Sequence, residues 1–297
     1  MSSESENELE YKLLTKDKVE DALAIQAETM KLENLAIGLG MFEEDGAPEE
    51  MNLLFREIIK DGTTLVAVDK KTDELVFPNF GIVNLSLRFS SNICVCLKAK
   101  PRAGEKDELE VFIEENLRYR TCRELVKFLD DVSVSWLLAE LLNLDRVSAS
   151  IYSLIALSAS EASVPGFEAL YIQNSVDIFE SYDTKGAMEL FYLGTNPRYQ
   201  GRGIGRQMVQ NCIEFGRGLL NGTMKRTSID GSVLDQHVLP EVIFGLFASN
   251  YSQKIADQLN FKCLREIRYD DYTFAGRKMS ERIGSVHKTA RLQALKL

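Results

Sequence analysis

Asn196–Arg206 reads Asn-Pro-Arg-Tyr-Gln-Gly-Arg-Gly-Ile-Gly-Arg, a basic glycine loop between two apolar segments. The bulky apolar residues of Met188–Thr195 before it predict a buried strand. After it, apolar residues recur at helical spacing and predict a helix that starts inside the loop (Ile204, Met208, Cys212 and Phe215). A strand, a glycine turn and a helix N-terminus make an anion site, because backbone N–H groups converge without Cβ atoms in the way. The loop therefore predicts a phosphate-bearing ligand.

The spacing of the glycines distinguishes among phosphate-binding loops. A Walker loop ends in Gly-Lys-Ser/Thr, and the chain has no Gly-Lys pair. A dinucleotide-binding loop of the Rossmann type requires a third glycine where Arg206 stands, or at Met208 if the motif starts at Gly203. Both loops are therefore disfavoured. What remains is the pattern Gln-x-x-Gly-x-Gly at Gln200–Gly205, directly after the expected strand.

This pattern resembles the pyrophosphate-binding motif of the GNAT superfamily of N-acetyltransferases, which bind acetyl-coenzyme A. The resemblance implies that acetyl-CoA is the acyl donor. It also implies that ten residues in and before the loop bind it (Leu193, Gly194, Thr195, Gln200, Gly201, Arg202, Gly203, Ile204, Gly205 and Arg206). Four arginines against one glutamate within Arg198–Arg217 form a basic segment on an acidic protein, which suits a compact polyanionic ligand.

Composition and charge limit the class of protein. The 297 residues are 45% hydrophobic and 27% charged, enough for one large globular domain or two small ones. The formal net charge of −10 argues against nucleic acid as the main partner. The first ten residues are acidic and serine-rich, without an apolar signal core, and no apolar run approaches the length of a membrane span. We therefore expect a cytoplasmic protein with no membrane span.

The candidate metal ligands are few and scattered. The chain has two histidines, His237 and His287, and neither lies in a ligand-like cluster. Its five cysteines have no metal-type spacing and are expected to be reduced thiols in the core (Cys94, Cys96, Cys122, Cys212 and Cys263). The sequence therefore predicts neither a metal site nor a Ser-His-Asp triad.

The order of predicted elements extends the resemblance over most of the chain. Residues 9–14 read as a strand, and helices start near residues 17 and 48. Residues 63–69 and 74–89 read as a hairpin, residues 90–107 as mixed, and residues 108–144 as helical. After the unassigned residues 145–166 come the strand and helix of the glycine loop. A strand at 242–247, a helix at 251–259 and strands within 261–274 follow.

This order resembles the GNAT fold over about residues 9–279. The resemblance implies an α/β protein with a mixed, mostly antiparallel central sheet flanked by helices. A helical insertion at about 105–182 would precede the strand that binds the cofactor. Residues 1–8 are expected to form a disordered acidic tail, and residues 280–297 a basic C-terminal tail.

Two further segments narrow the resemblance. Phe247–Phe261 contains a Tyr-Ser pair at 251–252, and Arg268–Tyr272 reads Arg-Tyr-Asp-Asp-Tyr. With the glycine loop, they are similar to the insect arylalkylamine N-acetyltransferases. That resemblance implies Glu33 as general base, Ser252 beside the thiol of coenzyme A, and a bulged strand at Leu193–Thr195 that binds the oxyanion. Without the resemblance, Glu33 is better interpreted as a surface carboxylate at a helix end, and Ser252 can be interpreted as a helix N-cap.

Three residues depart from the family pattern. Asn34 stands where proline is usual, Ala248 where the family has the first of two serines, and Asn260 where it has glycine. Asparagine tolerates the left-handed conformation better than most residues, so the turn at Asn260 is expected to persist. The other two departures leave room for a relative that binds coenzyme A without catalysis.

The resemblance implies transfer of an acetyl group from acetyl-CoA to the primary amine of a small, arylalkyl acceptor by direct attack. The alternative is a catalytically attenuated relative that binds coenzyme A as a sensor or interaction protein. Aromatic residues of the insert serve either the core or a pocket for an aromatic amine (Phe112, Tyr119, Phe128, Trp136 and residues 167–182). The sequence does not select an oligomeric state.

Overall fold

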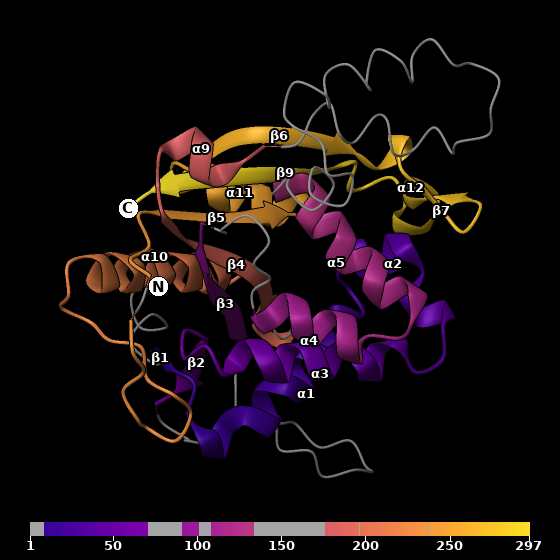
Figure 1. The fold of residues 1–297 in the computed structure, drawn as a ribbon. Helices are drawn as coiled ribbons and strands as arrows, with labels where there is room; N and C mark the ends of the chain where they lie inside the picture. The colour runs from indigo at the N-terminus through magenta and orange to yellow at the C-terminus, as the bar shows by residue number, and fades with distance from the viewer. Residues whose placement is uncertain (1–8, 71–90, 101–107, 134–175, 196, 237) are drawn as a thin grey trace.

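The computed structural model describes residues 9–70, 91–100, 108–133, 176–195, 197–236 and 238–297 (Figure 1). Its centre is a seven-stranded sheet in the order β1-β2-β3-β4-β5-β9-β6. The strands are β1 (Leu9–Leu13), β2 (Leu65–Asp69), β3 (Ser91–Ala99), β4 (Gly186–Thr195), β5 (Val242–Phe247), β6 (Lys262–Arg268) and β9 (Thr289–Lys296). Every neighbouring pair is antiparallel except β4 and β5, which are parallel. The expected mixed, mostly antiparallel α/β sheet is confirmed.

Helices cover both faces of this sheet, because its strands alternate apolar residues between two cores. Val66 and Val68 of β2 face one core, and Leu65 and Ala67 face the other. The first core is completed by α1 (Val19–Met30), α2 (Asn34–Leu39), α3 (Ala47–Ile59), α5 (Arg120–Ser133) and α9 (Ile178–Tyr182). The second is completed by α10 (Ile204–Leu220) and α11 (Asn250–Gln258). Two of the remaining helices are α4 (Glu108–Asn116) and α12 (Met279–Ile283).

The partner of β2 differs from the expected one. Residues 74–89, expected to form the second strand of a hairpin, lie outside the described residues. The strand paired with β2 is β3, in a register that joins Leu65 to Ile93. β3 falls in the segment that the sequence left mixed, where polar residues at both ends obscure the buried centre, Cys94–Cys96. Of the expected helical insert, α4, α5 and α9 are described.

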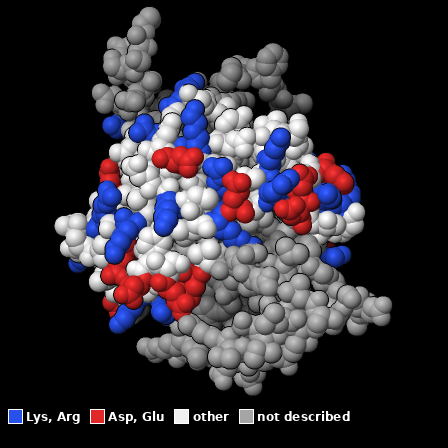
Figure 2. Space-filling model, turned by 90° about the horizontal axis from the view of Figure 1, so that it is seen from above, with Lys and Arg blue, Asp and Glu red and all other residues white. Residues whose placement is uncertain are grey.

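The expected basic tail at residues 280–297 is wrong. β9 lies inside the sheet, paired with β5 on one side and β6 on the other. Four of its side chains are completely buried (Ala290, Leu292, Gln293 and Ala294). The basic composition of this segment suggested a solvent-exposed tail, but its cations pair with acidic side chains of the folded domain. Arg291 lies 2.5 Å from Glu266, and Arg277 lies 3.2 Å from Glu43. In Figure 2, which shows the molecule from above, basic and acidic side chains are interspersed over the surface.

Four of the five cysteines are buried, as expected, whereas Cys263 is exposed on the edge strand β6. Within the described part of the chain, no helix is both long and apolar enough to span a membrane. The same residues contain no group of three or more histidine, cysteine or acidic side chains placed to hold a metal ion.

Candidate active site

The site lies where β4 and β5 separate. Their parallel pairing runs over only three positions and ends at Glu189 and Phe244. Directly after the last pair the two strands are still close, because a Cβ on Gly245 would lie 3.0 Å from the carbonyl oxygen of Leu190. Beyond this point a cavity of about 970 Å³ opens, lined by β4, β5 and the starts of α2, α10 and α11. All the predicted site residues line this cavity except Arg202.

The glycine loop turns from β4 into α10 as the spacing predicted. Gly201 and Gly203 have φ angles of +77° and +79°, and Gly203 is the N-cap of α10. Nothing lies within 4 Å of a Cβ built on either glycine, so the backbone conformation is what requires glycine there. The amide of Gln200 donates to the carbonyl of Thr195 at 3.1 Å and ties the loop to the end of β4.

The first turn of α10 offers backbone N–H groups to the cavity. Gln207 is the first residue whose N–H reaches back to a helical carbonyl, that of Gly203, at 3.1 Å. The N–H groups of Ile204–Arg206 precede it and have no carbonyl one turn earlier in the helix. A Cβ on Gly205 would lie 3.3 Å from Ile255, so α10 packs closely against α11. Arg206 lines the cavity, whereas the guanidinium of Arg202 lies over the ring of Tyr199.

Glu33 lies on the opposite wall, as the N-cap of α2. Its two carboxylate oxygens accept hydrogen bonds from the N–H groups of Leu35 at 2.9 Å and Ala36 at 2.7 Å. Burial raises the pKa of this carboxyl above its ordinary value, and the two N–H donors oppose that shift. Its charge in turn adds to the effect of burial in raising the pKa values of Tyr192 and Tyr269. Glu33 is therefore both a helix cap and a carboxylate with raised pKa on the cavity wall.

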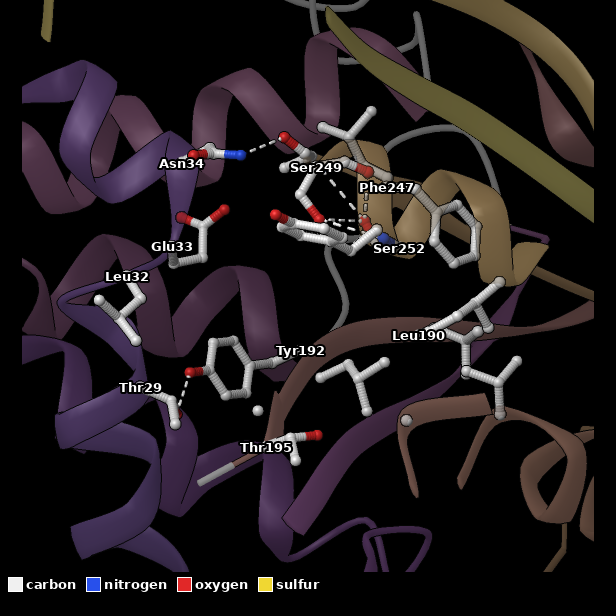
Figure 3. A pocket seen from close by; sticks show the side chains of 18 of the residues that line it. Thr29, Leu32, Glu33, Asn34, Leu190, Tyr192, Thr195, Phe247, Ser249 and Ser252 are labelled. Atoms are coloured by element: carbon white, nitrogen blue, oxygen red, sulfur yellow. Dashed lines mark hydrogen bonds between the residues drawn. The ribbon is translucent and has the colours of Figure 1, made fainter. Parts of the chain in front are cut away.

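Two serines meet at the start of α11. Ser249, and not Ser252, is the N-cap, and the two form a reciprocal capping box. Their hydroxyl oxygens lie 3.0 Å apart, and both residues line the cavity. Figure 3 shows Glu33 and Asn34 on one side of the cavity and this serine pair on the other. The chain therefore has a second serine beside Ser252, at position 249 rather than at position 248.

The bulge of β4 is not at Gly194. The register with β3 passes from Tyr192 to Leu190 across consecutive residues of β3, so the extra residue is Phe191. Gly194 is paired regularly with Asn92. A Cβ there would lie 2.5 Å from the hydroxyl oxygen of Thr29, which is hydrogen-bonded to Tyr192 at 2.6 Å. Glycine at this position therefore makes room for the contact between α1 and β4.

One part of the wall is apolar. It is formed by side chains of α1, α3, α5 and β4 (Met30, Met51, Phe55, Leu125, Leu129 and Phe191). The aromatic residues considered from the sequence lie elsewhere: Phe112 and Tyr119 pack on the core, and Phe128 contacts Tyr272 edge to face at 4.8 Å. Trp136 and residues 167–175 lie outside the described residues. The spacing of Leu125 and Leu129, one helical turn apart, is the signal that could have identified this wall.

Comparisons with known proteins concern the fold and the segment that contains the glycine loop. Residues 154–232 match the sequence model of the Acetyltransferase (GNAT) family. No protein of curated function matches the sequence. Several solved structures share the fold at low sequence identity. A putative arylalkylamine N-acetyltransferase 7 from the yellow fever mosquito Aedes aegypti has a TM-score of 0.57 at 13% identity, over 97% of this chain and 87% of that one.

Two further structures extend the likeness. Arylalkylamine N-acetyltransferase 2 from Aedes aegypti has a TM-score of 0.57 at 12% identity, over 97% of this chain and 98% of its own. An agmatine N-acetyltransferase has a TM-score of 0.52 at 13% identity, over 97% and 100% of the two chains. The match to the GNAT family model spans the glycine loop, and the chain shares the fold of these N-acetyltransferases.

Proposed function

We propose that the protein transfers an acetyl group from acetyl-CoA to the primary amine of a small acceptor with an apolar, arylalkyl body. The observation that carries this proposal is that one cavity is lined by the glycine loop, Glu33 and the pair Ser249 and Ser252. The donor would lie with its pyrophosphate at the loop and the start of α10, where backbone N–H groups and Arg206 favour an anion. These residues bind the donor and take no part in the chemistry.

Glu33 is suited to act as the base. An alkylamine has a pKa near 10, as a lysine side chain does, so it arrives protonated at neutral pH. Attack on the thioester carbonyl requires the neutral amine, and Glu33 is the carboxylate among the described residues of the wall. Its raised pKa brings its proton affinity closer to that of the amine. The proton would pass to Glu33, directly or through one water.

The remaining steps involve β4 and α11. The new C–N bond gives a tetrahedral oxyanion, which we place at the bulge around Phe191, where the ladder with β3 is interrupted. Collapse of this intermediate breaks the C–S bond and releases the thiolate of coenzyme A. As the C–S bond breaks, the nitrogen of the intermediate loses its second proton. Ser252, hydrogen-bonded to Ser249, is placed to give its hydroxyl proton to the thiolate and to regain one from that nitrogen. The proton held by Glu33 then leaves to solvent. The products are then the N-acetylamine and coenzyme A.

The lining of the cavity favours a monoamine. The wall around Phe55, Leu125 and Leu129 is apolar, and Glu33 is the carboxylate that its described residues provide. A second cationic group on the acceptor would lose hydration there without an opposing charge, which costs several kcal/mol. We therefore expect arylalkylamines to be better substrates than agmatine or a polyamine. Two of the similar structures are named for arylalkylamines and one for agmatine, so both classes belong in the test.

The test is a turnover assay with purified protein. Acetyl-CoA is incubated with a panel of arylalkyl monoamines, alkyl monoamines, agmatine and a polyamine, while release of free thiol is followed. We expect turnover with the arylalkyl monoamines and a lower kcat/KM for the dicationic acceptors. Tight binding of acetyl-CoA in calorimetry with no turnover on any amine would contradict the proposal. That outcome would instead support a relative that binds coenzyme A as a sensor or interaction protein.

A further inference from the structure

Two of the residues that depart from the family pattern, Asn34 and Ala248, contact each other. The side-chain amide of Asn34 donates to the carbonyl oxygen of Ala248 at 2.7 Å, across 214 residues of sequence. The dashed line from Asn34 in Figure 3 marks this hydrogen bond. The hydroxyl of Tyr269 donates to the same oxygen. Both lone pairs of one partly buried carbonyl are therefore used by side chains from two distant segments.

These three residues connect the two sides of the cavity. Asn34 is the first residue of α2 and directly follows Glu33, the N-cap. Ala248 lies between the end of β5 and Ser249, the N-cap of α11. The hydrogen bond thus joins the helix start that carries the carboxylate to the helix start that carries the serine pair. Asn34 is 6% exposed and Tyr269 is completely buried, so water competes little for either bond.

The hydrogen bond of Asn34 adds to the other contacts that hold the start of α2, which are the cap of Glu33 and the burial of Leu35 and Ala36. α2 has six residues, too few for an isolated helix to hold its own conformation in water. At its other end Arg282 donates to the carbonyl of Gly38 at 3.3 Å, which holds the last turn but not the first. The carboxylate of Glu33 has its raised pKa because α2 holds it in the buried wall. Whatever fixes the first turn of α2 therefore fixes both the place and the proton affinity of Glu33.

We propose that Asn34 is a positioning residue: with Tyr269 it holds the carbonyl of Ala248 and so fixes Glu33 opposite Ser249 and Ser252. The proposal rests on the proposed function, in which Glu33 accepts the proton of the amine. Misplacement of a reacting group by about 1 Å can cost a hundredfold in rate. Loss of the amide is therefore expected to lower kcat about 10- to 100-fold and leave the KM for acetyl-CoA within twofold, since the glycine loop is untouched.

The decisive variant is Asn34→Pro. Proline is tolerated at the first position of a helix, and Glu33 already has the extended conformation that a following proline requires, with φ −80° and ψ 128°. The variant keeps the helix start but removes the side-chain donor, and with it the backbone N–H of residue 34, which also interacts with the Glu33 carboxylate. Asn34→Ala also removes the donor while keeping the backbone N–H, and Tyr269→Phe removes the second donor. Gln236→Ala is the matched control, because its amide donates to the carbonyl of Leu219 at 3.2 Å, outside the cavity lining.

Two measurements test the proposal. In steady-state kinetics the Asn34 variants are expected to lose kcat as stated, and the acidic limb of their pH profile is expected to move to lower pH as water reaches Glu33. In amide hydrogen exchange, residues 31–40 and 247–256 are expected to exchange about tenfold faster than in wild type, with no change in Gln236→Ala. If Asn34→Pro keeps kcat, the pH profile and exchange protection within twofold of wild type, the positioning role is refuted.

The outcomes separate this inference from the proposed function. If wild type turns over no amine, the proposed function fails, and the exchange experiment alone decides whether Asn34 couples the two helix starts. If wild type is active and the variants match it, the positioning role fails while the function stands. If Asn34→Ala does not fold, Asn34→Pro and Tyr269→Phe decide the question, and unchanged kinetics and exchange in both refute the proposal.

Discussion

Glu33 combines two tasks that a single carboxylate can perform together. Each of its oxygens accepts one N–H from the first turn of α2, and a carboxylate oxygen can accept more than one hydrogen bond. The remaining acceptor capacity is available to a proton from the cavity. Replacing Glu33, the proposed base, therefore also disturbs a helix cap, and an informative substitution has to keep the cap. Glutamine does so in part, because its amide oxygen still accepts one N–H.

Glu33→Gln is expected to lower kcat/KM for the amine about 10²- to 10⁴-fold, the range for loss of a general base. The dissociation constant of acetyl-CoA, measured by calorimetry, is expected to stay unchanged. The matched control is Asp177→Asn, which alters the N-cap carboxylate of α9 outside the cavity lining. An undiminished rate in Glu33→Gln would remove Glu33 as the base. A comparable loss of kcat/KM in Asp177→Asn would show that the effect of Glu33→Gln comes from loss of a helix cap and not from loss of a base.

The pH profile of kcat/KM gives a second prediction. Only the ionised carboxylate accepts a proton, so activity falls as pH falls through the pKa of Glu33. Since burial raises that pKa, the acidic limb is expected above the ordinary range of glutamate. The profile of Glu33→Gln is expected to lack this limb. An acidic limb at an unshifted glutamate pKa in wild type would mean that the carboxylate is solvated during turnover.

At the scale of elements, local requirements explain which parts of the site could be predicted. The motif could be predicted because it depends on neighbours in sequence. Glycine is required for the positive φ at positions 201 and 203, and apolar residues at helical spacing follow directly. The conformation of Asn260, with φ +62°, was likewise anticipated from its side chain. The bulge was misplaced at Gly194 because that glycine accommodates Thr29, a neighbour only in space. The contact of Asn34 with Ala248 had no local signal at all.

Alanine at Gly201 or Gly203 is expected to cost about 1–2 kcal/mol of stability, the strain of a Cβ at positive φ. Binding of acetyl-CoA is expected to weaken about tenfold, because the Cβ would stand where a phosphate approaches the backbone. Gly222→Ala is a matched control, since Gly222 has φ +75°, no atom within 4 Å of a built Cβ, and no place in the cavity lining. Equal affinity in all three variants would exclude the loop as the phosphate site.

α5, which supplies Leu125 and Leu129 to the cavity, is held by a buried carboxylate on α3. Glu50 accepts the N–H groups of Arg118 and Tyr119 at 2.6 and 2.9 Å, just before α5 begins. Glu50→Ala leaves both donors without this acceptor and is expected to destabilise the fold by about 3 kcal/mol in denaturant unfolding. Glu49→Ala, an exposed neighbour on the same helix, is expected to change stability by less than about 0.5 kcal/mol. Similar values for the two would show that Glu50 does not anchor α5.

For the whole molecule, the sequence identified the sheet, the glycine loop and the helices that follow it. It failed where pairing joins segments distant in the chain. The pairing of β9 with both β5 and β6 is one such case, because the basic residues of 277–296 were judged by composition rather than by their partners. Burial of Leu292 depends on strands that begin dozens of residues earlier. The pattern of charged residues indicates which side chains are exposed. It does not indicate which strands pair, or in which register, because that depends on segments distant in the chain.

The inner position of β9 leads to a stability prediction. Leu292 is completely buried between two strands, and Leu292→Ala is expected to cost about 2–5 kcal/mol of unfolding free energy. Lys296→Ala, at the exposed end of the same strand, is expected to be nearly neutral. Thermal and denaturant unfolding of the two variants check this. Equal stability of both would mean that residues 289–296 do form a dispensable tail.

The place of β9 also bears on how the chain is made. In the sheet order, β5 and β6 are joined only through β9, although both precede it in sequence. During synthesis, the ladder that β5 forms on its outer side cannot begin until residues 289–296 have left the ribosome. The nascent chain therefore carries β5 with an open edge until β9 has emerged. For that interval the edge is open to mispairing and to chaperones, and donor binding is expected only after β9 has inserted.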